Sequence, residues 1–118
     1  MSAANAYYQQ RGETLDYTNA SGSKIDANTL VTIGDRVGVA DRDIPDGETA
    51  VLHVSGVFRV TKSSSNVIAM GKTVYYDGEG ITEAADDGGN PATAYVKVGY
   101  AAAPAAASDT EILVKLNG

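Results

Sequence analysis

The chain contains no cysteine and no tryptophan, and only one histidine and three prolines among its 118 residues. Without cysteine, neither disulfide bonds nor zinc sites built from thiolates are available. No apolar run is long enough to cross a bilayer, and the opening MSAANAYYQQRGE lacks the charged start and apolar stretch of a secretory signal. We therefore expect a soluble protein that makes no membrane contact and gains its stability from packing or from partners.

Positive charge is also scarce, because nine Lys and Arg residues face fifteen Asp and Glu residues, which gives a net charge of −6. The basic residues are spread from Arg11 to Lys115 instead of forming a cluster. Such a chain repels nucleic acid, so we expect no nucleic-acid partner. The length suits one domain with a modest hydrophobic core.

Short runs rich in Val, Ile, Thr and Tyr, separated by scattered glycines, are the main pattern in the chain. This pattern predicts an all-β fold, either a small β-sandwich or a barrel-like domain. We expect an extended N-terminal arm over residues 1–12 and a single β domain over residues 13–118. The candidate strands are Thr29 to Ile33, Arg36 to Ala40, Glu48 to Val60, Lys72 to Tyr76, Thr93 to Tyr100 and Thr110 to Leu116.

The longest candidate strand, Glu48 to Val60, alternates apolar and polar positions, so its even-numbered face reads as core. Ser55-Gly56 in its middle suggests a bend that lets the strand serve two sides of the fold. The last two candidates pair across the alanine-rich connector AAAPAAASD, which Pro104 prevents from forming a helix and which we expect to be an exposed loop. Residues 83–92 are rich in turn formers and predict a second surface loop.

The tripeptide Gly71-Lys72-Thr73 matches the end of a nucleotide-binding P-loop. That motif requires a glycine at position 66, where this chain has Asn66, and it requires a helix afterwards, where this chain has a β-branched and aromatic run. We interpret the tripeptide as the start of a short strand that leads into a tight turn at Asp77-Gly78.

Groups that could support catalysis or bind a metal are few. His53 is the only histidine, and it lies on the polar face of a strand, where a bond to solvent or to a neighbour is the ordinary role. Asp41 and Asp43 have the spacing of a calcium loop, but Pro45 occupies the third ligand position. We therefore expect no catalytic site, no metal and no cofactor, and thus no enzyme.

The first residues form an uncharged segment without a period that would bury one face. Such a terminus is commonly disordered. Tyr7 and Tyr8, however, offer large amphipathic side chains of the kind that an arm uses to dock on a neighbouring molecule. The tyrosines at 75, 76, 95 and 100 lie on strands, where they serve either as core and subunit interface or as a platform for a sugar or peptide.

Four segments, in order along the chain, resemble the phage capsid cement (head decoration) proteins. The opening NAYYQQRGETL is similar to the family's start, and the middle shares Gly38-Val39-Ala40, Gly47-Glu48 and Gly56-Val57-Phe58. GKTVYYDGEGIT and the closing strand after the alanine-rich loop also fit the family. Members are sometimes labelled as RecA-type recombinases, which the failed P-loop match here does not support.

This resemblance implies a virion structural protein that binds the outside of the expanded phage capsid and stabilises it. Its partners would be the major capsid protein and further copies of itself, in a homotrimer. It would be made in the host bacterial cytoplasm and end on the virion. We expect the arm to contact the capsid through Asn5, Tyr7, Tyr8, Gln9, Gln10 and Arg11. The alternative is a carbohydrate-binding or host-recognition module of a phage tail or fibre.

Overall fold

The computed structural model describes residues 4–118, so the first three residues of the expected arm lie outside the described part. Within that part the chain forms strands and no helix, which confirms the all-β class. The strands are β1 (Thr14–Thr18), β2 (Leu30–Ile33), β3 (Arg36–Ala40), β4 (Thr49–His53), β5 (Val57–Thr61), β6 (Thr73–Tyr76), β7 (Ile81–Thr82), β8 (Val96–Ala101) and β9 (Glu111–Leu116). Over residues 4–118, no helix has the length and apolar character needed to span a membrane.

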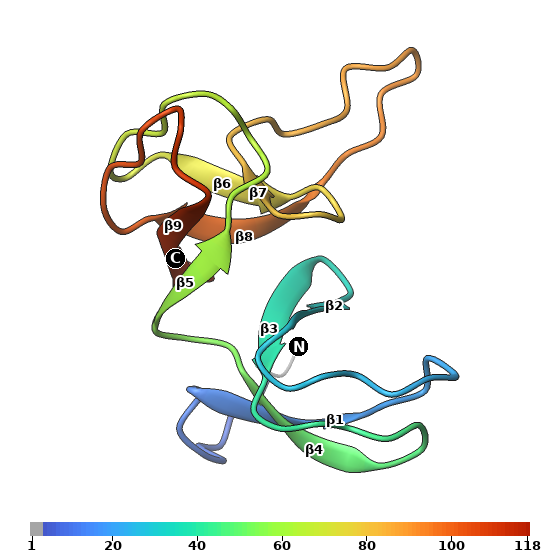
Figure 1. Ribbon diagram of the computed structural model, residues 1–118. Helices are drawn as coiled ribbons and strands as arrows, with labels where there is room; N and C mark the ends of the chain where they lie inside the picture. Colours follow the sequence, from blue (N-terminus) through green and yellow to red (C-terminus); the bar gives the residue numbers. More distant parts are fainter. Residues whose placement is uncertain (1–3) are drawn as a thin grey trace.

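Two antiparallel sheets make up the molecule (Figure 1). The four-stranded sheet has the order β1-β4-β3-β2, and the five-stranded sheet has the order β5-β9-β8-β6-β7. The five-stranded sheet curls toward closure, because Lys62, just after β5, forms a parallel bridge with Ile81 in β7. This half-barrel agrees with the predicted barrel-like architecture.

The predicted long strand Glu48 to Val60 is wrong as a single strand. It is two strands, β4 and β5, and they belong to different sheets. The chain changes direction at Ser55 and Gly56, and Gly56 has a φ of 107°, which a residue with a side chain rarely adopts. The bend expected at this dipeptide is therefore confirmed, and it carries the chain from one sheet to the other.

The other predicted strands lie close to the observed ones. The predicted bounds of β3 match the structure, those of β2, β6 and β9 differ by one residue, and β8 begins three residues later than expected. The expected antiparallel pairing of β8 with β9 is confirmed. Two strands were not predicted, the two-residue β7 and the edge strand β1, whose sequence TLDYT carries too few apolar residues to show alternation.

The alanine-rich connector between β8 and β9 is not the fully exposed loop that was expected. Ala105 in this connector is 3% exposed and forms an antiparallel bridge with Ile68. Nearby, the buried Lys62 side chain donates from Nζ to the carbonyl oxygens of Ser64 and Ala107. The small alanine side chains allow two loops to pack closely over one end of the half-barrel. Of the predicted surface loop over residues 83–92, in contrast, residues 84–92 are exposed, on a loop that extends away from both sheets (Figure 1).

Apolar side chains form two clusters, and β3 contributes to both. Val37 and Val39 point into the larger cluster, inside the half-barrel, while Ala40 points into the smaller one. The larger cluster is completed by Ile68, Val74, Ile81, Val98, Ala101, Ala105, Ile112, Val114 and Leu116, and the smaller by Val31, Ile44, Ala50 and Leu52. Because alternate residues of a strand face opposite sides, β3 is buried on both faces and joins the two halves.

Candidate functional site

The six residues expected to contact a partner lie together on one exposed segment before β1. Tyr7 is 86% exposed and Tyr8 is 83% exposed, the highest values among the large apolar side chains of the described residues. Asn5, Gln9, Gln10 and Arg11 are exposed as well. The segment therefore presents two aromatic rings to solvent, although burying such rings would be favourable by about 25 cal/mol per Å² of apolar surface.

Among residues 4–12, the arm is held only near its junction with the domain. The Gln10 side-chain amide donates to the carbonyl oxygen of Thr14 at 3.3 Å, and Arg11 forms an ion pair with Glu13 at 3.4 Å. Both contacts are local and exposed, so they stabilise the segment little. The first bond to a distant part of the chain is donated by the backbone N–H of Val54 to the carbonyl of Glu13. Residues 4–12 are thus available for an intermolecular contact.

A second candidate surface is an open cleft of about 510 Å³ between the two sheets. Its floor consists of apolar side chains from both sheets, and its rim carries charged and polar groups. The floor residues are Leu30, Val39, Phe58, Val60 and Tyr76, and the rim includes Asn28, Thr29, Arg59, Thr61, Glu79, Gly80 and Glu111. Sequence reasoning did not find this cleft, because the same apolar alternation in β5 is expected for a fully covered core strand.

The rim of the cleft carries one ion pair. Arg59 Nε lies 3.5 Å from Glu111 Oε1, with most of both side chains exposed to solvent. Glu79, on the turn between β6 and β7, adds a further carboxylate. The charges around the cleft therefore sum to a small negative value, over a floor that is apolar.

The single histidine has the ordinary role that was expected for it. His53 Nε2 lies 2.9 Å from Asp41 Oδ1, and the imidazole ring packs at a tilt against the Phe58 ring, with 5.8 Å between the centroids. The side chain is 37% exposed. This contact links β4 to the segment after β3 and to β5, so it supports the junction between the two sheets.

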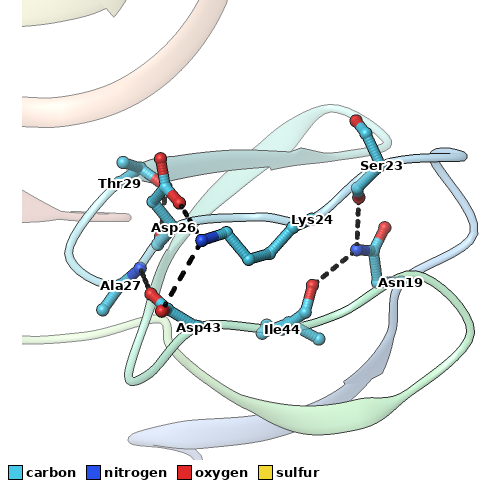
Figure 2. Close-up of polar contacts among 8 residues, drawn as sticks. All are labelled: Asn19, Ser23, Lys24, Asp26, Ala27, Thr29, Asp43 and Ile44. Atoms are coloured by element: carbon cyan, nitrogen blue, oxygen red, sulfur yellow. Dashed lines mark hydrogen bonds and ion pairs between the residues drawn. The ribbon is translucent and has the colours of Figure 1, made fainter.

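Asp43, one of the two aspartates that were considered as calcium ligands, lies with Asp26 between loops of the four-stranded half (Figure 2). Lys24 Nζ lies 3.3 Å from Asp26 Oδ1 and 3.9 Å from Asp43 Oδ2, and Asp43 Oδ1 accepts a bond from the backbone N–H of Ala27. Within residues 4–118, no three acidic or histidine side chains come close enough to hold a metal ion together. These carboxylates connect the β1–β2 loop to the β3–β4 turn.

One buried amide organises the same region. Asn19 is fully buried, and its Nδ2 group donates to the carbonyl oxygens of Ile44 and Ser23, both at 2.8 Å, as Figure 2 shows. Its Oδ1 atom accepts bonds from the backbone N–H and the hydroxyl of Ser21. Every hydrogen-bonding group of this side chain is satisfied, which is what a buried amide requires.

The P-loop-like tripeptide is a turn followed by a strand, as interpreted from the sequence. Gly71 has a φ of 87°, and β6 begins at Thr73. After β6, the Asp77 carboxylate accepts bonds from the Ser63 hydroxyl and from the backbone N–H groups of Glu79 and Gly80. Partial desolvation raises the pKa of Asp77, but these bonds together lower it by more, so the pKa lies below its usual value.

Glu83 has a similar environment beside the β5–β6 loop. Desolvation raises the pKa of its carboxyl. Bonds from the Ser64 hydroxyl and the Asn66 amide, together with the nearby positive charge of Lys62, lower the pKa by more, so the pKa lies below its usual value. The carboxylate is therefore held ionised and fixes the loop. Both carboxylates accept a bond from a serine hydroxyl, Asp77 from Ser63 and Glu83 from Ser64, and these bonds explain the local structure of the loops.

Comparison with protein families finds a match to a family model described as phage cement protein, over residues 9–116. The match includes every observed strand and, from the exposed segment, Gln9, Gln10 and Arg11, while Asn5, Tyr7 and Tyr8 precede it. Comparison with curated proteins finds no match, and comparison with solved structures finds none either.

Proposed function

The chain belongs to the phage cement protein family, and from this membership we propose that it is a virion structural protein that binds the outside of the expanded phage capsid and stabilises it. The observation that carries the proposal is the family match over residues 9–116, which spans both sheets. The family is one of structural proteins, so the function rests on contact surfaces.

The binding partner in this proposal is the major capsid protein, and the protein acts as a homotrimer on the virion surface after synthesis in the host bacterial cytoplasm. A protein that binds only the expanded shell stabilises that form by mass action. Three linked binding surfaces strengthen attachment beyond the affinity of any one, provided that all three can engage at once. Neither nucleic acid nor membrane takes part, which is in keeping with the net charge of −6.

In this proposal the chain consists of an arm, residues 1–12, and a single β domain, residues 13–118. The arm contacts the capsid through Asn5, Tyr7, Tyr8, Gln9, Gln10 and Arg11. The exposure of both tyrosines and the purely local bonds of the arm support this role. An extended segment can lie across a neighbouring subunit and pair with it as an added strand.

The proposal is tested by mixing the purified protein with empty expanded heads and with unexpanded precursor heads, followed by sedimentation. We expect the protein to co-sediment with expanded heads and to leave precursors bare, and we expect decorated heads to resist heating better than bare ones. Equal binding to both forms, or no binding to either, would contradict the proposal.

The role of the arm is tested by deleting residues 1–11, with Tyr7→Ala/Tyr8→Ala as a variant that keeps the arm length. We expect both variants to fold and to keep the oligomer mass of the intact protein while binding expanded heads more weakly. The matched control is Val67→Ala, which shortens an exposed apolar side chain on the β5–β6 loop and leaves the arm unchanged. Decoration by the deletion variant at normal strength would show that the arm is not a capsid contact.

A further inference from the structure

We infer that the cleft between the two sheets receives an extended segment of the major capsid protein, which adds a strand to the free edge of β5. The inference rests on the proposed function and adds to it a second contact, separate from the arm. It also states the chemistry of the bound segment, which is an extended backbone with apolar side chains at alternate positions.

The free edge of β5 follows from its ladder with β9. The backbone N–H of Leu116 donates to the carbonyl oxygen of Gly56, and the backbone N–H of Lys62 donates to the carbonyl oxygen of Thr110. Gly56–Leu116 and Lys62–Thr110 are therefore hydrogen-bonded pairs, one at each end of the β5–β9 ladder. In an antiparallel pair, the backbone N–H and C=O groups of successive residues alternately bond the partner strand and point away from it. The N–H and C=O groups of Arg59 therefore point away from β9, and in residues 4–118 no other strand pairs with β5.

The cleft runs along this edge instead of lying on one face of the sheet. Phe58, Arg59, Val60 and Thr61 are four consecutive residues of β5, and all four line the cleft. Because alternate side chains of a strand point to opposite faces, only a cleft at the strand edge can touch all four. The unpaired backbone groups of Arg59 thus open into the cleft.

One end of the edge is already covered, which limits the length of an added strand. A Cβ atom at Gly80 would lie 2.7 Å from the carbonyl oxygen of Thr61, so the backbone at Gly80 packs directly against the end of β5. The backbone N–H of Ser63 also donates to Ile81 across this closure. The open edge is therefore the part from Val57 to Val60, which suits a short strand with Arg59 at its centre.

The floor of the cleft determines which side chains the added strand carries. Leu30 and Val39 from the four-stranded sheet face Phe58, Val60 and Tyr76 from the five-stranded sheet. A volume of about 510 Å³ lies in the range of pockets that hold small ligands, so it accommodates a few side chains. A strand that pairs with Arg59 can place every second side chain on this apolar floor while the others face solvent.

Family membership favours the capsid protein over a second copy of this chain as the occupant, because a phage cement protein associates with the capsid. The cleft rim carries Glu79 and Glu111 against Arg59, so a segment without acidic side chains fits it better than an acidic one. The proposed function already assigns the exposed arm to the capsid, so the arm of a second copy is not the expected occupant.

The test uses Arg59→Pro and Arg59→Ala, compared with the unaltered protein in binding to expanded heads. Proline removes the backbone N–H that faces the cleft and leaves the β5–β9 bonds intact, because proline is tolerated where the N–H of an edge strand points outward. We expect Arg59→Pro to bind roughly tenfold more weakly, since a hydrogen bond is lost and its partner is left unpaired. Arg59→Ala removes only an exposed ion pair, so we expect its affinity for expanded heads to change by about threefold at most.

A second variant avoids any question of folding. Because the chain has no cysteine, Arg59→Cys introduces one thiol, at a side chain that is 71% exposed. We expect the unlabelled variant to bind heads like Arg59→Ala, and the same folded protein to lose binding after reaction with a bulky maleimide, which fills the cleft.

The outcomes are distinct. If the unaltered protein binds heads and both Arg59→Pro and the labelled variant bind equally well, the cleft does not take a capsid segment, while the proposed function stands. If the unaltered protein binds no heads, the proposed function fails and this inference fails with it. If Arg59→Pro instead changes the oligomer mass of the free protein, the occupant is a second copy, and the inference is overturned.

Discussion

The two halves of the molecule are stabilised in different ways. In the five-stranded half, eleven buried apolar residues form the core, and two of these are supplied by β3 of the other sheet. In the four-stranded half, only five buried apolar residues pack together, and they are accompanied by the fully buried amide of Asn19 and by the Lys24 ion pairs. The comparison indicates that a small sheet can replace part of its missing core with satisfied polar contacts between loops.

The difference follows from how each half closes. The five-stranded sheet curls until Lys62 meets Ile81, so its inner face surrounds the larger apolar cluster except along the open edge of β5. The four-stranded sheet stays open, and the β1–β2 loop and the β3–β4 turn cover its inner face through the bridge between Ile25 and Ile44. Loops carry many backbone polar groups, and these need partners when they are buried. Asn19 supplies such partners.

The largest effect expected from this comparison is in the five-stranded core. Leu116 is fully buried, and Leu113, on the same strand, is 42% exposed on the other face. Leu116→Ala leaves a cavity and should lower the free energy of unfolding by about 2–5 kcal/mol, a large part of the total for a domain of this size. Leu113→Ala should lower it by less than about 1 kcal/mol. Urea denaturation of both variants measures the difference, and equal losses would show that the two faces are not distinct.

The next effect is in the four-stranded half, where Asn19→Ala tests whether polar contacts replace core. The substitution removes four hydrogen bonds, two donated to the carbonyl oxygens of Ile44 and Ser23 and two accepted from Ser21, at about 0.5–1.5 kcal/mol each. We expect a total loss of about 2–4 kcal/mol in urea denaturation. Asn5→Ala, on the exposed arm, is the matched control and should change stability little. If Asn19→Ala costs no more than its control, packing alone holds this half.

The sequence predicted the parts of the fold that depend on local pattern. Short runs of Val, Ile, Thr and Tyr between turn formers located β3, β6 and β9, because these strands bury one face, or both, against apolar neighbours. The position of Gly56 indicated the change of sheet, since its conformation there requires glycine. Alternation could not show that the residues on either side of Gly56 pair with different strands, because pairing is set by contacts between residues distant in the chain. The edge strand β1 was missed because its sequence TLDYT carries too few apolar residues to show alternation.

Of the two candidate contact surfaces, only the arm could be predicted from sequence. Its lack of charge and its adjacent tyrosines are visible in MSAANAYYQQ. The cleft depends on β5 having a partner on one side only, and on Leu30 and Val39 lying across from Phe58. In sequence, Phe58 and Val60 look the same whether their strand is covered or open on one edge.

A smaller effect is expected at the strand that joins the two halves. A Cβ atom at Gly38 would lie 3.0 Å from Leu52 Cβ and 3.2 Å from the His53 carbonyl oxygen. Gly38→Ala therefore pushes β3 away from β4 and should cost about 1–2 kcal/mol, by overpacking. Gly12→Ala is the matched control, because a Cβ atom there meets nothing within 4 Å. Hydrogen exchange should show faster opening in both sheets for Gly38→Ala, and faster opening in only one would mean that the halves unfold separately.

The smallest expected effect is a loss of stability at low pH that originates in the five-stranded half. Bonds from Ser63, Glu79 and Gly80 hold the pKa of Asp77 below its usual value despite partial desolvation. A carboxyl with a lowered folded pKa contributes stability that is fully present above its unfolded pKa, about 3.9, and is lost as the pH falls through the folded pKa. We expect the unaltered protein to lose stability as the pH falls below about 4.

Asp77→Asn tests this expectation in urea titrations at several pH values. The variant should be less stable than the unaltered protein at neutral pH, and it should lose less stability on acidification. Asp35→Asn, at an exposed turn of the four-stranded half, should keep the acid dependence of the unaltered protein. If it instead flattens that dependence as much as Asp77→Asn does, the acid sensitivity belongs to both halves, and it no longer distinguishes the half built on an apolar core.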